Sequence, residues 1–388
     1  MTYPCSRLMM ILLSLGSAVV PADSWAAPPT PQDDSIVSLL KPIRERHHLP
    51  GLVGGFVHNQ RLAAAGAIGV RKHGTPEPIT VNDLLHLGSC TKAMTASMIA
   101  TLIEEKKLSW DTTLGDVFPD LKGKMLTDWT DVTLLQLFTH RSGLPANGPY
   151  FSLGARRSTT EQRQVLLAKV LARKPEEKPG TKYDYSNLGY ILAGAMAEKV
   201  TGVSWEDLMR QRLFRPLGMD SAGFGPPGTK EQVDQPWGHI FVGETLVPLQ
   251  KDNPGVLGPA GTVHCTLRDW ASFAALHLNS GRPSPPQGCL TPLLLPASFT
   301  RLHTPPSGEE YACGWGVVPR RWAGGKTLTH NGSNTMWFAV VWLAPQRQFG
   351  VLAVTNVGGK TAAKACDEAA GALIGHYEKY FSSRGSKH

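Results

Sequence analysis

Two residues of the chain, Ser89 and Lys92, have the types and the spacing of a catalytic nucleophile and its base. Three helical steps place Lys92 one turn beyond Ser89 and about 60° around the axis, so that its amine can face the hydroxyl. A serine hydroxyl attacks weakly unless a neighbour takes its proton, and a lysine removed from water can do so. The same spacing recurs at Ser38 and Lys41, where it most simply marks a helix surface. The alternative for Ser89 is therefore a helix-capping serine beside a solvated lysine.

A second candidate pair is Tyr185 and Asn187, in a turn-rich segment that leads into an apolar helix. A tyrosinate held beside cations can act as a general base, and Asn187 can hydrogen-bond a substrate amide. Tyr-x-Asn occurs once in the chain. The alternative is a tyrosine packed on the core in a turn, with Asn187 as the N-cap of the helix.

A third candidate group is Thr-His-Asn-Gly-Ser at 329–333, at the end of one expected strand and just before another. His330 supplies a titratable donor, and Gly332 lets a substrate approach backbone N–H groups at a sheet edge. His86 and Gly88 match the same His-x-Gly pattern, so the weight of this group comes from its order and context. His264 can also reach the cleft that these three groups would line. The alternative for His264 is a structural loop histidine.

The elements that must position these residues are predicted from hydrophobic periodicity. An apolar pattern after Asp33 or Asp34 predicts a helix to about His47, and the runs at 51–58 and 61–70 predict a β-hairpin. Strand patterns recur near the other end at 327–330, 336–343 and 349–356, followed by a helix expected over 361–380. Helical patterns between these ends fall at 93–106, 134–138, 160–172, 187–201, 205–214 and 267–278.

Strands at both ends with helices between them are typical of an α+β protein. We expect an antiparallel sheet built from both termini and flanked by helices, with an inserted, mostly helical domain. The sheet part is expected at about 33–85 and 305–388, and the helical insertion at about 86–304. Residues 224–262 hold many glycines and prolines, so they are predicted to form a long loop, and such loops are often functional.

The segment after Ser89 is predicted to be a buried helix. Met94, Met98 and Leu102 are apolar at i, i+4 and i+8. The N-terminus of such a helix adds backbone N–H groups that favour a developing negative charge. Cys90 adjoins the serine, but one helical step is about 100°, so we expect its thiol to face away.

The N-terminus has the features of a secretory signal at 1–26. Arg7 is the basic residue, Leu8–Val20 is the apolar core, and Ser24-Trp25-Ala26 fits a small-x-small cleavage site. The apolar core is shorter than the roughly 20 residues that span a bilayer. We therefore expect cleavage near Ala26 and a soluble periplasmic or secreted protein without a stable membrane anchor.

The charge and cysteine content exclude several functions. The net charge of +8 is spread thinly, with basic pairs such as Lys106-Lys107 in place of a stripe, which argues against nucleic-acid binding. No cysteines are spaced as CxxC, so a structural zinc site is not indicated. Loss of Cys5 with the signal leaves five cysteines, whose disulfide pairing the sequence leaves open. No metal or organic cofactor is expected, because side chains and water complete the chemistry.

Taken together, the three motifs resemble the serine β-lactamase and penicillin-binding-protein superfamily. The resemblance is to the branch that holds class C β-lactamases, D-aminopeptidases and related esterases, and it covers nearly the whole mature chain at 27–388. Further stretches of the chain that read like this branch are FTHRSGLP (138–145), YSNLGYILAGAMAEKVTG (185–202), PLGM (216–219) and GPAGTVHCTLRDW (258–270).

The resemblance implies a role for each motif residue. Ser89 would be the acylated nucleophile and Lys92 its base or proton carrier. Tyr185 would protonate the leaving group and later activate the deacylating water. Asn187 would orient the substrate amide, and the backbone N–H groups of Ser89 and Ser333 would form the oxyanion hole.

One departure from the branch concerns His330-Asn331-Gly332, which stands where class C β-lactamases have Lys-Thr-Gly. The fixed positive charge that meets a substrate carboxylate becomes a histidine, which fits peptidase and esterase members better than efficient β-lactamases. The sequence thus predicts an exported serine hydrolase acting on an amide or ester: a β-lactam, a D-amino-acid peptide, including those derived from peptidoglycan, or a small ester. The alternative is a penicillin-binding sensor that is acylated without efficient turnover. The oligomeric state stays open.

Overall fold

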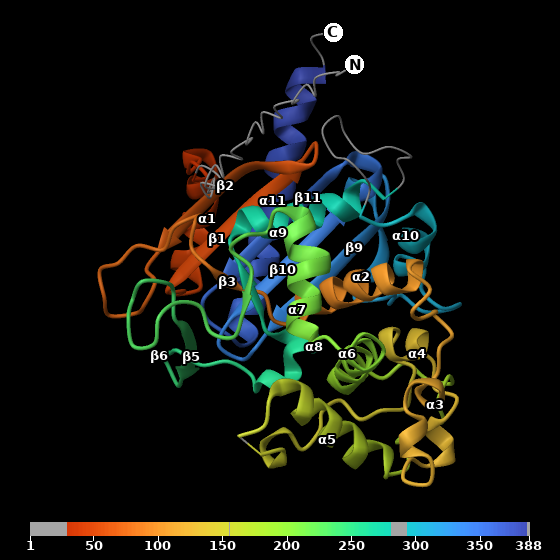
Figure 1. Ribbon diagram of the computed structural model, residues 1–388. Coiled ribbons are helices and arrows are strands. Elements are labelled where there is room, and N and C mark those ends of the chain that lie inside the picture. The colour runs from red at the N-terminus through yellow and green to blue at the C-terminus, as the bar shows by residue number, and fades with distance from the viewer. Residues whose placement is uncertain (1–28, 155, 281–292, 386–388) are drawn as a thin grey trace, which may run out of the picture.

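The computed structural model describes residues 29–154, 156–280 and 293–385 (Figure 1). The predicted signal peptide at 1–26 and Cys289 lie outside these ranges. The strands are β1 (Gly51–His58), β2 (Arg61–Gly69), β3 (Leu85–His86), β4 (Gly223–Phe224), β5 (Gly238–Val242), β6 (Thr245–Leu249), β7 (Val263–Cys265), β8 (Gly316–Arg320), β9 (Gly325–Ser333), β10 (Phe338–Ala344) and β11 (Phe349–Thr355). The α-helices are α1 (Asp34–Arg46), α2 (Thr91–Glu104), α3 (Leu114–Val117), α4 (Leu134–Phe138), α5 (Thr159–Leu171), α6 (Asn187–Thr201), α7 (Trp205–Met209), α8 (Gly258–Gly261), α9 (Leu267–Leu278), α10 (Pro296–Leu302) and α11 (Lys360–Gly385).

The main sheet joins the two ends of the described chain. Its six strands follow the order β2-β1-β11-β10-β9-β8, and β1 pairs antiparallel with β11, so that Leu52 lies opposite Thr355. Figure 1 shows this as red and orange strands beside blue ones. The α+β class and the antiparallel sheet built from both termini are confirmed.

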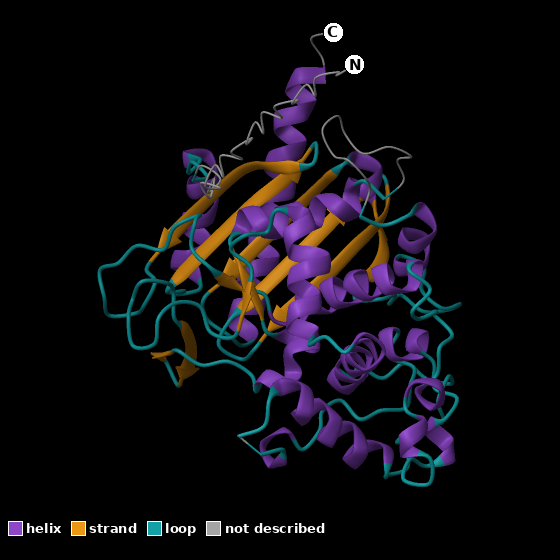
Figure 2. Cartoon of the chain, in the orientation of Figure 1, coloured by secondary structure: helices purple, strands orange, loops and turns teal. Residues whose placement is uncertain are grey.

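Successive side chains of each strand point to opposite faces of the sheet. Both faces of this sheet are covered by helices. Leu52 and Phe56 of β1 pack with α1 and α11 on one face. Val53 and Val57 point to the other face and join the larger core, which α2 and α9 help to build. In Figure 2 most helices lie on that second side and beyond one end of the sheet.

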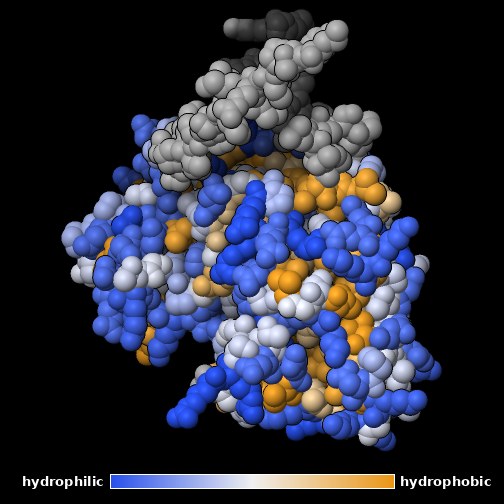
Figure 3. All heavy atoms as spheres, in the orientation of Figure 1, coloured by the Kyte–Doolittle hydropathy of each residue, from blue (hydrophilic) through white to orange (hydrophobic). Residues whose placement is uncertain are grey.

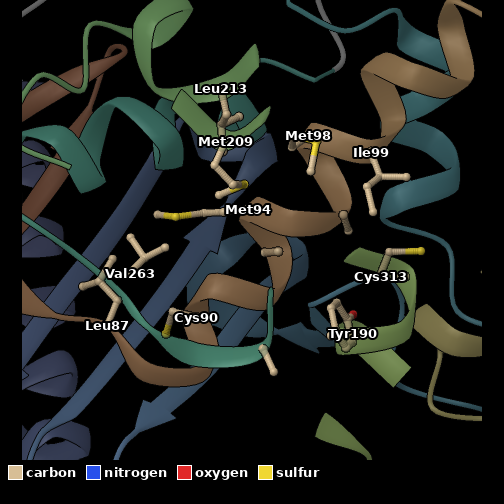
Figure 4. Packing of buried hydrophobic residues seen from close by; sticks show 14 of the residues in the cluster. Leu87, Cys90, Met94, Met98, Ile99, Tyr190, Met209, Leu213, Val263 and Cys313 are labelled. Atoms are coloured by element: carbon tan, nitrogen blue, oxygen red, sulfur yellow. The ribbon is translucent and has the colours of Figure 1, made fainter. Parts of the chain in front are cut away.

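The helix that follows Ser89 is buried as its periodicity predicts. Met94, Met98 and Leu102 of α2 have no exposed surface. Figure 4 shows Met94 and Met98 in the packed interior near Met209 and Leu213. Because its surroundings leave α2 little freedom, the residues at its N-terminal end are fixed to the core.

Several element predictions need correction. Residues 224–262 are not one long loop, because they contain the β5–β6 hairpin and the short helix α8. The predicted helix over 205–214 is α-helical only to Met209 and then continues as one π-helical segment. The edge strand β8 was not predicted.

Within the described ranges, none of the helices combines the length and the apolarity that crossing a bilayer requires. The face in Figure 3 is hydrophilic over most of its area, with smaller hydrophobic patches. The four described cysteines, Cys90, Cys265, Cys313 and Cys366, are buried and free.

Candidate active site

Ser89 lies in a 3-10 turn, Gly88–Cys90, that connects β3 to α2. It does not cap α2, whose N-cap is Cys90 without a side-chain hydrogen bond. Ser89 is half-buried, while Cys90 beside it is buried in the core, with its thiol 3.6 Å from the His330 carbonyl oxygen. The alternative of a helix-capping serine is therefore wrong.

Lys92 is fully buried, and its ammonium nitrogen is surrounded by acceptors. Nζ lies 3.1 Å from Ser89 Oγ, 2.7 Å from Asn187 Oδ1 and 2.9 Å from the Ala260 carbonyl oxygen. Burial lowers the pKa of Lys92 to about 7. An appreciable fraction of this lysine is thus neutral near neutral pH and able to accept the serine proton.

The second Ser-x-x-Lys shows what the same spacing does without burial. Ser38 and Lys41 are both exposed on α1, and the Ser38 hydroxyl donates to the Asp34 carbonyl oxygen at 2.8 Å. The Ser-x-x-Lys spacing alone therefore does not make a reactive pair. Ser89 and Lys92 differ from Ser38 and Lys41 in their buried surroundings.

Tyr185 and Asn187 converge on Lys92. The Lys92 ammonium lies 4.8 Å from the centroid of the Tyr185 ring, and Asn187 accepts its hydrogen bond. Ser186, not Asn187, caps α6. Burial raises the pKa of the Tyr185 phenol, and a hydrogen bond with Ser89 acts in the opposite direction. The resting tyrosine is a phenol, which favours Lys92 as the first acceptor of the serine proton.

His140, which was not predicted as a site residue, hydrogen-bonds the residues on both sides of Tyr185. Its carbonyl oxygen accepts from Asp184 N–H at 2.8 Å, and its Nδ1 accepts from Ser186 N–H at 3.1 Å. Its ring lies 4.4 Å from that of Tyr185, centroid to centroid. His140 adopts a positive φ of 56°, a left-handed backbone conformation that is uncommon for a residue other than glycine.

Asn147 is a second residue that the sequence reasoning missed. Its Oδ1 accepts from the Asn187 amide at 2.9 Å, so the orientation of Asn187 is fixed on both sides, by Asn147 and by Lys92. No local pattern marks Asn147, because its contact joins positions 40 residues apart.

His330 faces the same cluster but carries no fixed charge. Its Nδ1 lies 2.6 Å from the Asn331 carbonyl oxygen and must hold the ring proton, so Nε2 accepts from the Tyr311 hydroxyl at 3.0 Å. Burial and the nearby Lys92 lower the pKa of His330 to about 3. A neutral histidine therefore stands at the position where the resemblance to class C β-lactamases leads one to expect a lysine. Tyr311 is a partner that the sequence did not reveal.

The backbone at Gly88 and Gly332 brings together the two N–H groups expected to form an oxyanion hole. A Cβ on Gly88, which has a φ of +49°, would clash with Ser333 N. A Cβ on Gly332 would clash with the Leu87 carbonyl oxygen and lie 2.9 Å from Ser89 N. Only glycine allows β9 to approach the serine turn this closely.

Two other features lie apart from this cluster. His264 is held at Nδ1 by the Gly225 carbonyl oxygen at 2.9 Å and pairs with His86 across β3 and β7. A groove of about 1310 Å³ runs between α1, the β5–β6 hairpin and the start of α11, and none of the predicted catalytic residues lines it. Within the described ranges, no three His, Cys, Asp or Glu side chains are grouped to hold a metal ion.

Comparison with known proteins agrees with this fold. A family model described as Beta-lactamase matches residues 36–375, so the chain belongs to that family. The class C β-lactamase of Rhodobacter sphaeroides shares the fold with a TM-score of 0.69 and 22% identity, covering 89% of this chain and 99% of that one.

Two curated relatives extend the comparison to function. Penicillin-binding protein 4 of Amycolatopsis lactamdurans is 28% identical over 335 residues, which are 82% of this chain and 84% of that protein. Unguisins hydrolase ungD′ of Aspergillus campestris is 25% identical over 84% of this chain, and the match spans only 62% of its own length. The chain is a serine hydrolase of the β-lactamase, penicillin-binding-protein and esterase type.

Proposed function

We propose that this protein hydrolyses an amide or ester through an acyl-enzyme on Ser89. The observation that carries the proposal is the contact of 3.1 Å between the Ser89 hydroxyl and a buried lysine amine whose pKa lies near 7. A neutral amine at hydrogen-bonding distance is what a serine needs to become a nucleophile.

The reaction can be written from these residues. Ser89 Oγ attacks the substrate carbonyl carbon as Lys92 takes its proton, and the carbonyl oxygen becomes an oxyanion near the backbone N–H groups of Ser89 and Ser333. The proton leaves with the departing amine or alcohol by way of Lys92 and Tyr185 when the carbonyl–heteroatom bond breaks. Water then attacks the acyl-enzyme and loses a proton to neutral Lys92, directly or by relay through the Tyr185 hydroxyl. Lys92 returns that proton to Ser89 Oγ as the acyl–oxygen bond breaks, which releases the carboxylic acid and free Ser89.

The substrate proposal follows from His330. A buried, neutral histidine that already hydrogen-bonds Tyr311 and Asn331 offers no positive charge to a substrate carboxylate. We therefore expect esters and amides without a carboxylate near the scissile bond to react faster than β-lactams. Asn187, held by Lys92 and Asn147, would orient the acyl amide of a peptide, including one derived from peptidoglycan.

Export belongs to the same proposal. The signal-like N-terminus supports a periplasmic or secreted enzyme that meets small-molecule or peptide substrates outside the cytoplasm. The proposal includes no nucleic-acid partner, no stable membrane anchor and no cofactor. The competing proposal is a sensor of the penicillin-binding type that is acylated and not released.

Time-resolved intact mass spectrometry tests the proposal. The protein is mixed separately with a cephalosporin, a D-alanyl-D-alanine peptide and an activated acetyl ester. We expect an adduct that forms and decays as product accumulates, fastest with the ester and absent in Ser89→Ala. Ser38→Ala, at the exposed copy of the motif, is the matched control and should behave as wild type. A persistent adduct would favour the sensor, and no adduct from any reagent would refute the nucleophile assignment.

A further inference from the structure

A buried carboxylate, Asp252, lies behind the serine turn in the stretch between β6 and α8. Its side chain is 3% exposed. Oδ1 accepts from the Asn253 N–H at 2.7 Å and from the Asn334 side-chain amide at 2.8 Å, and Oδ2 lies 2.8 Å from Nε2 of His86. The His86 contact is a close electrostatic one and not an aligned hydrogen bond. Two N–H donors and the imidazole Nε2 therefore converge on the two carboxylate oxygens.

One arm of this network leads to the residue before Ser89. His86 is completely buried on β3, and its Nδ1 accepts from the Gly88 N–H at 3.1 Å. Because Nδ1 accepts, the ring proton is on Nε2 and faces Asp252. The imidazole thus connects the carboxylate to the backbone of the 3-10 turn that presents Ser89.

The other arm leads to the residue after Ser333. Asn334 is 2% exposed, donates to Asp252 through its amide nitrogen, and accepts from the Met336 N–H at 3.1 Å through its amide oxygen. It therefore fixes the turn between β9 and β10 at the point where the Ser333 N–H is presented.

We propose that Asp252 is a positioning residue for the oxyanion hole, acting through His86 on the Ser89 side and through Asn334 on the Ser333 side. The inference rests on the proposed function, because it assigns a role in stabilising the oxyanion of the acylation step. The two N–H groups come from segments distant in the sequence, the 3-10 turn at Ser89 and the end of β9 at Ser333. A displacement of about 1 Å between them is enough to cost activity.

The network needs a carboxylate and not merely a polar group of the same shape. In Asp252→Asn one of the two terminal atoms becomes an NH₂ donor. That donor must face either the His86 Nε2–H or the Asn334 amide and the Asn253 N–H, so one arm loses the carboxylate oxygen that faces it. The variant changes no atom that touches the substrate and keeps the volume of the side chain.

The test compares Asp252→Asn with Asp269→Asn. Asp269 is a matched control because it is also a buried carboxylate, 6% exposed, but accepts from Ser221, which adjoins neither Ser89 nor Ser333. For each variant we would measure the acylation rate constant with the acetyl ester, the inhibition constant of an arylboronic acid and the melting temperature. The boronate forms a tetrahedral adduct on the serine and so depends on the oxyanion hole.

We expect Asp252→Asn to slow acylation and weaken boronate inhibition each by about 10- to 100-fold, somewhat less than the loss of a whole oxyanion donor. Noncovalent substrate affinity should change little, and Asp269→Asn should retain wild-type acylation at a comparable melting temperature. If Asp252→Asn fails to fold, Asn334→Ala and His86→Asn, which each cut one arm, are expected to show the same two losses.

The outcomes separate this inference from the hydrolase proposal. Wild-type acylation and boronate inhibition in folded Asp252→Asn would overturn the positioning role and leave the enzyme intact. The positioning role would likewise be overturned if Asp252→Asn lost acylation and inhibition only in proportion to its fall in melting temperature, and Asp269→Asn did the same. A wild-type protein that no reagent acylates would refute the proposed function and this inference with it.

Discussion

At the scale of single residues, the chemistry depends on what buries Lys92. The amine contacts Ser89, Asn187 and Ala260 and has no carboxylate among these partners, so desolvation dominates its pKa. A surface lysine such as Lys41 has the same covalent structure and the same distance in sequence from a serine. The difference between a base and a solubilising charge is therefore made entirely by the surrounding fold.

The pH dependence of acylation should report this lysine. Because the folded pKa is lowered to about 7, the reactive neutral amine predominates only above that value. We expect the acylation rate constant with a neutral ester to fall about tenfold per pH unit below 7 and to level off above it. Stopped-flow acylation between pH 5 and 9 measures the profile, with Lys41→Ala as a control that should not shift it. An inflection near 10, the value of a solvated lysine, would contradict the assignment.

The candidate site was predicted from the sequence only where a short motif marks it. Ser89, Lys92, Tyr185 and Asn187 do meet in space, and Gly332 approaches the serine turn. Residues such as His140, Tyr311 and Asp252 were missed, because their roles come from contacts across the fold and from buried hydrogen bonds that leave no local pattern.

At the scale of elements, two strands that the sequence analysis did not predict, β8 and β6, each contain a proline. β8 contains Pro319, which usually argues against a strand, but β8 is the edge of the sheet, where a missing N–H is tolerated. β6 contains Pro248 and belongs to a two-stranded ribbon, which is all edge. In contrast, α2 and the β1–β2 hairpin were predictable, because their apolar periodicity reflects burial directly.

The helical part is held together by an ion cluster that bridges three helices. Arg163 of α5 is completely buried and hydrogen-bonds Glu198 of α6 and Glu206 of α7. Glu198→Gln would leave a buried guanidinium without its closest charge. We expect it to lower the free energy of unfolding by at most about 3 to 5 kcal/mol, the usual cost of removing one partner of a buried pair, because Glu206 still contacts the guanidinium.

Urea denaturation at pH 7 measures the effect of this substitution. Glu177→Gln removes the partner of Lys182 in an exposed pair and serves as the control, with little expected change. Equal midpoints for the two variants would mean that the helices are joined by apolar packing alone.

At the scale of the whole molecule, buried histidines make the fold sensitive to acid. Burial lowers the pKa of His303 and of His330 to about 3, and it lowers the pKa of His140 and His277 well below the usual value. The unfolded chain titrates these groups near 6.5, so below that pH it binds more protons than the native state. Stability is thus present above about pH 6.5 and is lost as the pH falls towards 3.

We expect each such histidine to cost up to about 1.4 kcal/mol of unfolding free energy per pH unit below 6.5. Urea unfolding at pH 7 and pH 5 measures the loss before most carboxylates titrate. His303→Gln, which removes the His277 partner at 2.8 Å, should reduce the difference between the two pH values. Equal stability at both would show that the buried imidazoles do not control acid unfolding.

The pairing of β1 with β11 sets the order in which the protein can form during synthesis. Leu52 leaves the ribosome about 300 residues before its partner Thr355. The first hairpin therefore keeps an open hydrogen-bonding edge until β11 has been translated. The six-stranded sheet cannot be completed before that point. Until β11 is available, the unpaired edge of β1 must be protected from pairing with other chains.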